Sequence, residues 1–226
     1  MKPELRRFGH GEHPLVLVDD MTGDVGAIID IADAMQPYPP AQKTLYPGLR
    51  RVIGKEDAAA SGYVDRLLQA LAPYIGGAFA TDAFDLIEAS FSMVTADPAT
   101  LAPAQRAPHF DSTDLRTIAI LHYLSVAPGT GTSFYRHRAS GIEQLTDANL
   151  APYLARARAE AEATAPGYIA GSNAAYEAIA AVEAVPDRLV MYRGALLHSG
   201  VIPADMELSA DPRRGRLTAN LFIQVR

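Results

Sequence analysis

His109 and Asp111 are separated by a single residue, and this spacing suits metal binding. In an extended strand, side chains two positions apart point to the same face, with their Cα atoms about 6.6 Å apart. One metal ion can bridge an imidazole and a carboxylate at that separation. The pair is weak evidence by itself, because a His-x-Asp sequence occurs by chance in many proteins. A third ligand must therefore come from elsewhere in the fold.

His198 is the candidate third ligand, at the end of the largely apolar run of residues 188–200 (RLVMYRGALLHSG). Two imidazoles and one carboxylate on one face form the donor set typical of non-haem Fe(II) oxygenases, and they leave coordination positions open. The chain contains no cysteine, so a transition metal must be held by imidazole and carboxylate groups. The residue types therefore favour a metal site built from His109, Asp111 and His198.

The hydrophobic pattern predicts the scaffold that must position these residues. The chain has 226 residues, 49% hydrophobic and 20% charged, a balance typical of a folded globular domain. From Asp85 onward, short runs rich in β-branched and aromatic residues predict a C-terminal half that is mainly sheet. The expected strands cover residues 14–18, 86–95, 116–126, 132–136, 188–192 and 217–225.

Helices are expected beside this sheet. Apolar residues at helical spacing predict helices over residues 25–35 and 58–75, within an N-terminal helical buttress of about residues 20–80. An Ala-rich helical insertion is expected over about residues 141–185, with helices at 147–164 and 172–185. Residues 36–54, rich in Pro, Gly and Tyr, predict a long ordered loop. We expect residues 1–226 to form a single domain.

The order of several segments resembles the Fe(II)/2-oxoglutarate-dependent oxygenase superfamily, especially its prolyl-hydroxylase-like branch. The resemblance covers about residues 91–225. Its segments are His109-Phe110-Asp111, the strand end at 121–125 (LHYLS), the turn and strand from Gly129 (GTGTSFY), His198 with the following Ser-Gly, and residues 216–222 (RLTANLF). The resemblance implies a double-stranded β-helix, which is a cupin-like jelly roll. It also implies that His109, Asp111 and His198 bind Fe(II), with 2-oxoglutarate as co-substrate.

By the same resemblance, Tyr123 and Arg216 bind the distal carboxylate of 2-oxoglutarate. Strand alternation agrees for the arginine, because one face of the last strand carries Arg216, Thr218, Asn220 and Phe222 while the other face is apolar. We expect the polar face to line the barrel, with Thr218 and Asn220 beside the co-substrate. A buried guanidinium opposite a carboxylate is satisfied by two parallel hydrogen bonds.

The spacing near Arg216 departs from the family pattern, because Arg216 lies further after His198 than is usual there. The intervening residues must form a loop, and Arg213 or Arg214 is an alternative partner for the carboxylate. The glycine-rich turn is Gly129-Thr130-Gly131 rather than an adjacent pair of glycines, although it still predicts a tight turn between strands.

The remaining histidines are weaker candidates. His122 precedes Tyr123 and therefore points to the opposite face, where a structural role is expected. His137 is expected either to contact substrate at the barrel mouth or to end a strand in solvent. His10 and His13 are candidates for adventitious metal binding only. The sequence contains no nucleophile elbow of a serine hydrolase and no Walker-type phosphate loop.

Charge and hydropathy exclude several classes of partner. The formal net charge of −6 gives no general attraction for nucleic acid or anionic membranes. No stretch approaches the roughly 20 apolar residues that span a bilayer, and the first residues lack the apolar centre of a signal peptide. We therefore expect a cytoplasmic protein that binds neither nucleic acid nor membrane.

The expected reaction is oxidation of a small-molecule or peptidyl substrate, with hydroxylation favoured and desaturation left open. Asp111 argues against halogenation, which needs an open position in place of the carboxylate. Two alternatives remain: a catalytically silent β-helix protein that binds a small molecule or a protein partner, and a cupin-type metal enzyme that does not use 2-oxoglutarate. The oligomeric state is left open.

The helical insertion and the Tyr-rich loop of residues 38–46 are expected to control substrate access. The insertion interrupts the strands that carry Phe134 and His198, so we expect it over or beside the barrel mouth. The alternative is that the insertion is an outer buttress.

Overall fold

A computed structural model of the chain describes residues 2–41 and 45–226. The helices of the described chain are α1 (Val25–Ala34), α2 (Ala58–Phe79) and α3 (Asp147–Ala163), with short 3-10 helices η1 (Pro98–Thr100) and η2 (Pro103–Arg106). Its strands are β1 (Lys2–Phe8), β2 (His13–Asp19), β3 (Gly48–Val52), β4 (Phe84–Val94), β5 (Thr117–Ser125), β6 (Gly131–His137), β7 (Tyr176–Glu183), β8 (Leu189–Arg193), β9 (His198–Val201) and β10 (Leu217–Val225). The expectation of a mainly β protein with flanking helices is confirmed.

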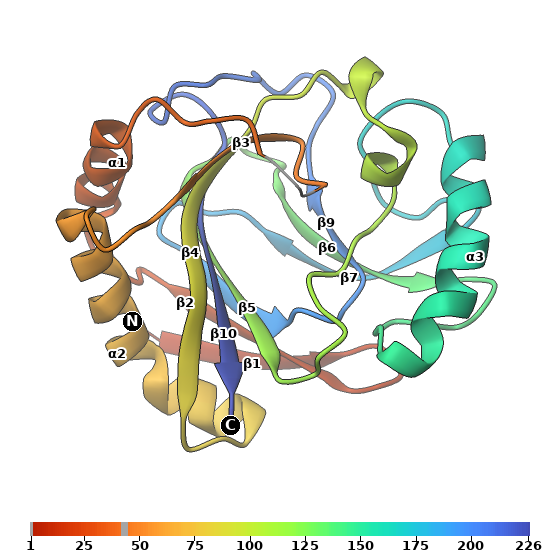
Figure 1. The fold of residues 1–226 in the computed structure, drawn as a ribbon, viewed down its shortest axis with the longest axis horizontal. Helices are drawn as coiled ribbons and strands as arrows, with labels where there is room; N and C mark the ends of the chain where they lie inside the picture. Colours follow the sequence, from red (N-terminus) through yellow and green to blue (C-terminus); the bar gives the residue numbers. More distant parts are fainter. Residues whose placement is uncertain (1, 42–44) are drawn as a thin grey trace.

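The described strands form two antiparallel sheets (Figure 1). The larger sheet has the order β1-β2-β8-β5-β10-β4-β3, and the smaller has the order β7-β6-β9. Apolar side chains from both sheets meet in a shared interior, which includes Leu17, Ala119 and Phe134. The two sheets therefore face each other, and side chains on their inner faces can converge on one site.

Helices α1 and α2 cover the outer face of the larger sheet (Figure 1). Helix α2 buries one apolar stripe against that sheet, and the stripe includes Val64, Leu67 and Leu71 at helical spacing. Burial of one such aliphatic side chain stabilises the fold by about 1.5–3 kcal/mol. The N-terminus of α1 is capped by Asp24, whose carboxylate accepts a hydrogen bond from the Ala27 amide.

Strand β10 follows the predicted alternation. Its apolar face packs among the helices of the outer layer through Leu217, Ala219, Leu221 and Ile223. Its other face turns toward the space between the sheets. Strand alternation thus separates a helix-packing face from a site-lining face, as the sequence predicts.

The expected helix over residues 172–185 is wrong, because Tyr176–Glu183 is strand β7. This segment pairs with β6 along its length, and the pairing outweighs the helix propensity of its alanines. The long loop expected over residues 36–54 also contains a strand, β3, which pairs with β4. Strands β1 and β9 were not predicted, since each is short or polar and gains its stability from pairing.

Helix α3 is an outer buttress that packs through Tyr153, Ala157 and Ala161 against Tyr135 and Tyr176 of the smaller sheet. Figure 1 shows α3 beside that sheet. Tyr168, further along the insertion, lines the cavity between the sheets, so control of substrate access by the insertion stays a prediction. The position of the insertion follows from β7, which returns the chain to the sheet and keeps α3 behind it. In the Tyr-rich loop of residues 38–46, positions 42–44 lie outside the described residues.

His137 is buried rather than solvated or in contact with substrate. Its ring is fully enclosed beneath α3, where Nε2 lies 2.7 Å from a carboxylate oxygen of Glu160 and Nδ1 lies 2.7 Å from the Ser140 hydroxyl. The side chain therefore pins α3 to the end of β6.

His122 joins three elements in a buried hydrogen-bond network, as its expected structural role requires. Its Nε2 donates to Asp187 over 2.9 Å, so its Nδ1 accepts from the Tyr63 hydroxyl over 2.7 Å in the neutral ring. Asp187 also accepts from the amides of Thr22 and Gly23 and from the Thr22 hydroxyl. The network ties α2 and the start of α1 to the larger sheet.

Replacement of Asp187 by asparagine should remove a pH-dependent part of the stability. Burial raises the pKa of Asp187, but hydrogen bonds from His122 and Thr22 outweigh it and hold the pKa at about 2. A depressed carboxyl pKa stabilises the fold above the unfolded value near 4, and this stabilisation is lost as pH falls through 2. Asparagine tolerates the positive φ of 63° at this position.

We expect the Asp187→Asn protein to lose about 2 kcal/mol at pH 7 relative to wild type, by urea unfolding. The difference should shrink between pH 5 and pH 2. Asp82→Asn, at an exposed aspartate, is the control. A constant difference across that pH range would contradict the assignment of the charge to the network.

Candidate metal centre

The backbone brings His109 opposite His198. The two residues form an isolated antiparallel bridge, in which each amide donates to the other's carbonyl over 2.9 and 2.8 Å. Residues directly opposite in such a pair project their side chains to the same face. The ring centroids consequently lie 4.3 Å apart. The Asp111 amide donates to the Gly194 carbonyl over 2.7 Å, which fixes the carboxylate beside the two rings.

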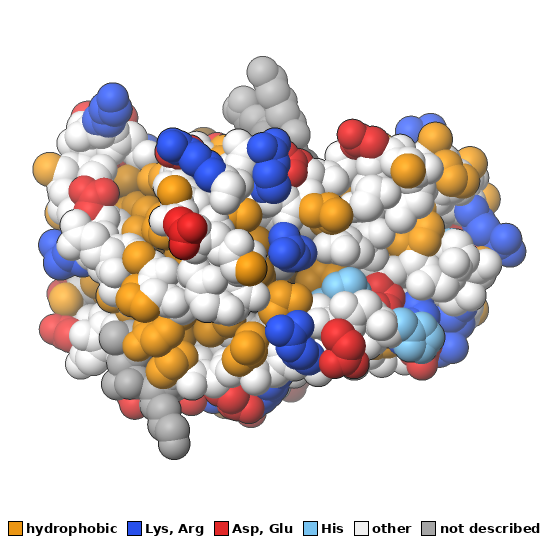
Figure 2. Space-filling model, turned by 90° about the horizontal axis from the view of Figure 1, so that it is seen from below, with side chains coloured by type: hydrophobic (Ala, Val, Ile, Leu, Met, Phe, Trp, Pro, Cys, Tyr) orange, Lys and Arg blue, Asp and Glu red, His pale blue; other side chains and the backbone are white. Residues whose placement is uncertain are grey.

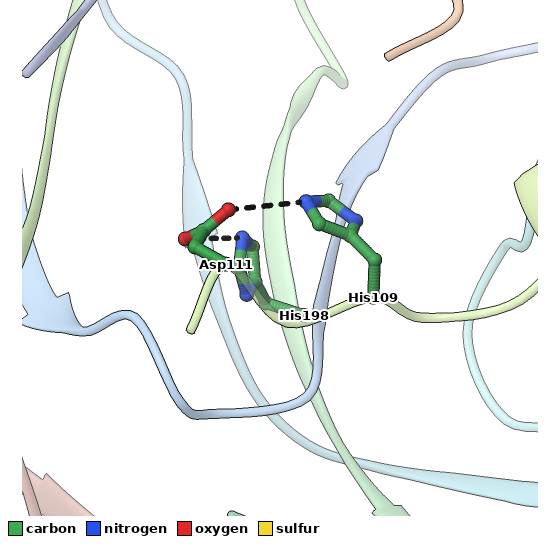
Figure 3. A group of neighbouring side chains, drawn as sticks. All are labelled: His109, Asp111 and His198. Atoms are coloured by element: carbon green, nitrogen blue, oxygen red, sulfur yellow. Dashed lines mark ion pairs between the residues drawn. The ribbon is translucent and has the colours of Figure 1, made fainter. Parts of the chain in front are cut away.

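Figure 3 shows the three side chains pointing toward one another. Asp111 Oδ1 lies 3.7 Å from His109 Nε2, and Asp111 Oδ2 lies 3.6 Å from His198 Nε2. One ligand atom from each residue falls within 4.8 Å of the others, close enough for one metal ion. Within the described residues, this is the one group of three or more such side chains that meets this criterion. The structure thus brings together the three residues that the sequence analysis selects as candidate metal ligands.

The tautomer of His198 is set by its neighbour Leu196. His198 Nδ1 lies 2.8 Å from the Leu196 carbonyl oxygen, which can only accept, so Nδ1 carries the proton. The Nε2 lone pair is then free to face Asp111. A hydrogen bond from the ring nitrogen that does not bind the metal is the usual way in which proteins orient a metal-binding imidazole.

The electrostatics of the centre favour a cation over protons. Burial, followed by the charge of His198, lowers the pKa of His109 to about 4, and burial lowers the pKa of His198 to about 4 as well. Burial raises the pKa of Asp111 to about 6, against the opposite influence of His109 and Arg50. At neutral pH the site therefore offers two neutral imidazoles and an ionised carboxylate, the protonation state that a divalent metal requires.

Gly194 leaves the space that Asp111 occupies. A Cβ atom at position 194 would lie 3.3 Å from Asp111 Cβ and 3.3 Å from Thr117 Cγ2. We expect Gly194→Ala to push the carboxylate away from the two imidazoles and to weaken Fe(II) binding by roughly tenfold while the protein stays folded. Anaerobic calorimetry of Fe(II) binding measures the effect. Gly77→Ala on α2 is the matched control, since no atom lies within 4 Å of its added Cβ. Equal Fe(II) affinities in the two variants would contradict this role for Gly194.

The three side chains line a cavity of about 710 Å³ between the two sheets. Its volume lies within the range of small-molecule sites. Tyr192 and Phe134 pack against His198, with ring centroids 4.9 and 6.3 Å from the imidazole. The exposed fractions of the side chains are 43% for His109, 16% for Asp111 and 6% for His198, so the centre opens to solvent on the His109 side.

Arg216 lies at one end of this cavity and is buried, 5% exposed. Its Nη2 donates to the Gly131 carbonyl over 3.0 Å, while its buried Nε has no hydrogen-bond partner among the described residues. The hydroxyl of Ser92 is likewise buried without a partner in the described chain and lines the same cavity. Thr218 and Asn220 line it too, on the face that strand alternation predicts. Hydrogen-bond donors without partners, beside the positive charge of Arg216, are suited to an anionic ligand.

Tyr123 is not among the described residues that line the cavity, and the expected hydrogen bond from its hydroxyl to a ligand there stays a prediction. In the described chain, Thr132 lines the cavity and hydrogen-bonds with the Tyr123 hydroxyl over 2.7 Å. Tyr123 instead supports Arg216, whose guanidinium carbon lies 5.9 Å from its ring centroid.

The alternative arginines lie away from the cavity. Arg213 pairs on the surface with Asp30 and Asp33, and Arg214 pairs on the surface with Glu207. Only Arg216 of the three lines the cavity in the described structure.

His13 and His10 are not near the metal centre. His13 contributes to a separate network around Glu143, whose carboxylate accepts from His13 and from the amide of His10. Arg136 completes this network with an ion pair to Glu143. These contacts hold the hairpin of β1 and β2 to the start of the insertion at Glu143.

Sequence reasoning missed several cavity residues, namely Arg50, Glu88, Ser92 and Tyr192. Leu45 and Tyr46, which also line the cavity, belong to the Tyr-rich loop of residues 38–46 that the sequence analysis expects near the site. The polar alternation along β4, where every second residue from Glu88 is Glu, Ser and Ser, was an available signal for an inward face. No comparable pattern marks Arg50, because its position depends on how β3 pairs with β4.

Charged side chains of both signs lie on the face of the molecule seen from below. Figure 2 shows them mixed over that face, with hydrophobic side chains among them. No helix in the described residues is both long and apolar enough to span a bilayer.

Several solved structures share this fold at low sequence identity. The non-heme alpha ketoglutarate dependent epimerase SnoN from nogalamycin biosynthesis matches with a TM-score of 0.53 and 11% identity, over 93% of this chain and 77% of that chain. HygX from Streptomyces hygroscopicus, with nickel and 2-oxoglutarate bound, matches with a TM-score of 0.51 and 16% identity, over 93% and 82%. EctD from S. alaskensis, with bound Fe, matches with a TM-score of 0.50 and 12% identity, over 99% and 84%.

The sequence comparisons are more specific about family than about activity. No curated protein sequence matches the chain. One family model, described as a family of unknown function, matches residues 1–223, which is nearly the whole chain. The protein with this candidate metal centre therefore belongs to the family of unknown function DUF6445.

Proposed function

We propose that this protein is an Fe(II)- and 2-oxoglutarate-dependent dioxygenase that hydroxylates a small substrate. The observation that carries the proposal is the convergence of His109, Asp111 and His198 in a cavity that also holds the buried cation Arg216. Support for the co-substrate comes from SnoN, an alpha ketoglutarate dependent epimerase, and from HygX, which was solved with nickel and 2-oxoglutarate bound.

The strand order supports a double-stranded β-helix. Strands β8-β5-β10-β4 lie side by side in the larger sheet, and β7-β6-β9 face them, with the His109 bridge extending the smaller sheet beyond β9. Two four-stranded layers that wind together in this order are the arrangement expected of a jelly roll. We propose that residues 1–226 form a single domain of this type.

The residues of the cavity fit both groups that the proposal requires. Two neutral imidazoles and one carboxylate are a donor set that suits non-haem Fe(II) and leaves positions open. The Nε of Arg216 and the hydroxyl of Ser92, both without a partner among the described residues, can donate to a carboxylate, and Thr218 offers a second hydroxyl in the same region. Iron would supply the activation of O₂ that none of the protein's side chains can supply.

The roles of the side chains follow from their positions. His109, Asp111 and His198 would hold the metal, and the Leu196 carbonyl would keep His198 in the binding tautomer. Arg216 would orient the distal carboxylate of 2-oxoglutarate, with Tyr123 and Thr132 supporting it from behind. Tyr192 would shield the centre from bulk water on the interior side.

Conversion of 2-oxoglutarate to succinate tests the proposal. Purified protein with Fe(II), ascorbate and O₂ should form succinate slowly even before its substrate is known, and omission of iron should stop the reaction. The His198→Ala protein is the negative control. No succinate above that control would contradict the proposed activity and would favour a binding protein or a metal enzyme that does not use 2-oxoglutarate.

A further inference from the structure

A second charged pair lines the cavity, apart from the metal centre and from Arg216. Arg50 reaches inward from β3, where its Nε donates to the Ser90 hydroxyl over 3.0 Å and its Nη2 donates to a carboxylate oxygen of Glu88. The side chains are 17% and 35% exposed, and both line the cavity. The pair therefore stands on the wall of the site and within reach of a bound molecule.

The strand register separates this pair from the Arg216 end. Along β4, Ser92 lies opposite Thr218, while Glu88 lies opposite Phe222. Four residues of extended strand cover about 13 Å, so Glu88 is well removed from the end where the co-substrate carboxylate would bind. Arg50 bends from the Ser92 level toward Glu88, and its guanidinium carbon lies 6.0 Å from the ring centroid of Phe222.

The guanidinium of Arg50 keeps donors available for a ligand. Its hydrogen bonds use Nε and one proton of Nη2. The second proton of Nη2 and the protons of Nη1 form a planar fork, which matches the two oxygens of a carboxylate. Glu88 can accept from a protonated amine at the same time, because among the described residues Arg50 engages one of its oxygens and no residue engages the other.

The balance of charge in the cavity favours a ligand without net charge. Among the described lining residues, the positive groups are Arg50 and Arg216 and the negative groups are Glu88 and Asp111, so their charges cancel. Fe(II) and 2-oxoglutarate also cancel each other. A substrate with a net charge would leave an uncompensated charge in a partly desolvated site, which is costly. A zwitterion would meet both members of the Arg50–Glu88 pair and leave the balance unchanged.

The neighbouring wall is apolar. Leu45, Ile87, Leu121 and Phe222 line the cavity, and Leu45 and Ile87 are 52% and 56% exposed. Large exposed hydrophobic side chains at the edge of a cavity favour an apolar ligand body. The ammonium and carboxylate of an α-amino acid share one carbon atom, so they can contact adjacent partners such as Arg50 and Glu88.

We propose that the substrate is a free α-amino acid with an apolar side chain, whose carboxylate binds Arg50 and whose ammonium group binds Glu88. This inference rests on the proposed function, since it assigns the substrate of that metal centre.

Anaerobic calorimetry on the Fe(II)–2-oxoglutarate protein tests the assignment. The probes are L-valine, L-leucine, L-isoleucine, L-methionine and L-phenylalanine, each with its carboxamide and its deamino acid. We expect at least one amino acid to bind, and either modification to weaken its binding by at least about tenfold, as loss of a charge-assisted contact should.

The variants assign each contact to a residue. Arg50→Met should bind the acid and its carboxamide about equally, while Glu88→Gln should lose the preference for the amine. Arg116→Met is the control, because Arg116 pairs with Asp114 on the surface with its side chain 63% exposed. Affinity for 2-oxoglutarate should be unchanged in all three variants, which also verifies that each is folded.

The outcomes separate this inference from the proposed function. If wild type does not form the Fe(II)–2-oxoglutarate complex, the proposed function fails and the inference fails with it. If the complex forms but none of the five amino acids binds, the inference alone is wrong. It is equally wrong if Arg50→Met weakens 2-oxoglutarate binding instead, or if neither variant changes the preference among the probes.

Discussion

The Asp111→Ala protein is expected to lose stoichiometric Fe(II) binding. The carboxylate bridges the space between the two imidazoles, with contacts of 3.7 and 3.6 Å to their Nε2 atoms. Its removal leaves two neutral nitrogen donors, and even changes in groups that only orient metal ligands weaken affinity by about 10–100-fold. We therefore expect a loss on the order of a hundredfold or more, measured by anaerobic equilibrium dialysis with iron analysis.

Asp114→Asn supplies the matched control for this prediction. Asp114 lies three residues further along, outside the cavity, and pairs with Arg116. The Asp114→Asn protein should bind Fe(II) as wild type does. Both variants should retain the circular dichroism spectrum of wild type, because Asp111 supports no core packing. Full iron occupancy in Asp111→Ala would show that the Asp111 carboxylate is not a metal ligand.

Replacement of Arg216 is expected to have the second largest effect, on the binding of 2-oxoglutarate. A charge-assisted hydrogen bond contributes about 1.5–3 kcal/mol, so loss of the guanidinium in Arg216→Ala should weaken binding by at least about tenfold. Arg216→Lys keeps the charge but loses the planar fork, so its affinity should be intermediate. Titration of 2-oxoglutarate into each iron-loaded protein under anaerobic conditions measures both affinities.

Arg214→Ala controls for general electrostatic effects, since Arg214 is exposed and pairs with Glu207. Its affinity for 2-oxoglutarate should equal that of wild type. If Arg214→Ala binds 2-oxoglutarate more weakly while Arg216→Ala binds it as wild type does, Arg214 rather than Arg216 binds the distal carboxylate. Unchanged affinity in both would leave the co-substrate without a cationic partner.

The metal-ligand candidates were predictable because their geometry is local. The i, i+2 spacing of His109 and Asp111 puts both on one side of an extended segment wherever that segment lies. His198 follows a strand that must be buried, so its position beside them needed only the order of strands. Arg216 was predictable for a similar reason. Alternation along β10 and the residue before it places Arg216 on the same face as Thr218 and Asn220, opposite the apolar face.

The parts that the sequence did not predict depend on contacts between distant segments. Residues 176–183 carry helix-forming alanines, yet pairing with β6 makes them a strand. His137 was expected at an open strand end, but α3 covers it and supplies Glu160 as partner. Arg50 enters the cavity only because β3 pairs with β4, and nothing in its local sequence indicates that pairing.

An anaerobic titration of the wild-type protein with Fe(II) and then 2-oxoglutarate shows whether the centre binds both groups. Chelation of the iron by 2-oxoglutarate should produce a weak visible charge-transfer band that saturates at one equivalent of each component, and the Asp111→Ala protein should not develop it. Stoichiometric Fe(II) binding without any such band on addition of 2-oxoglutarate would contradict the account.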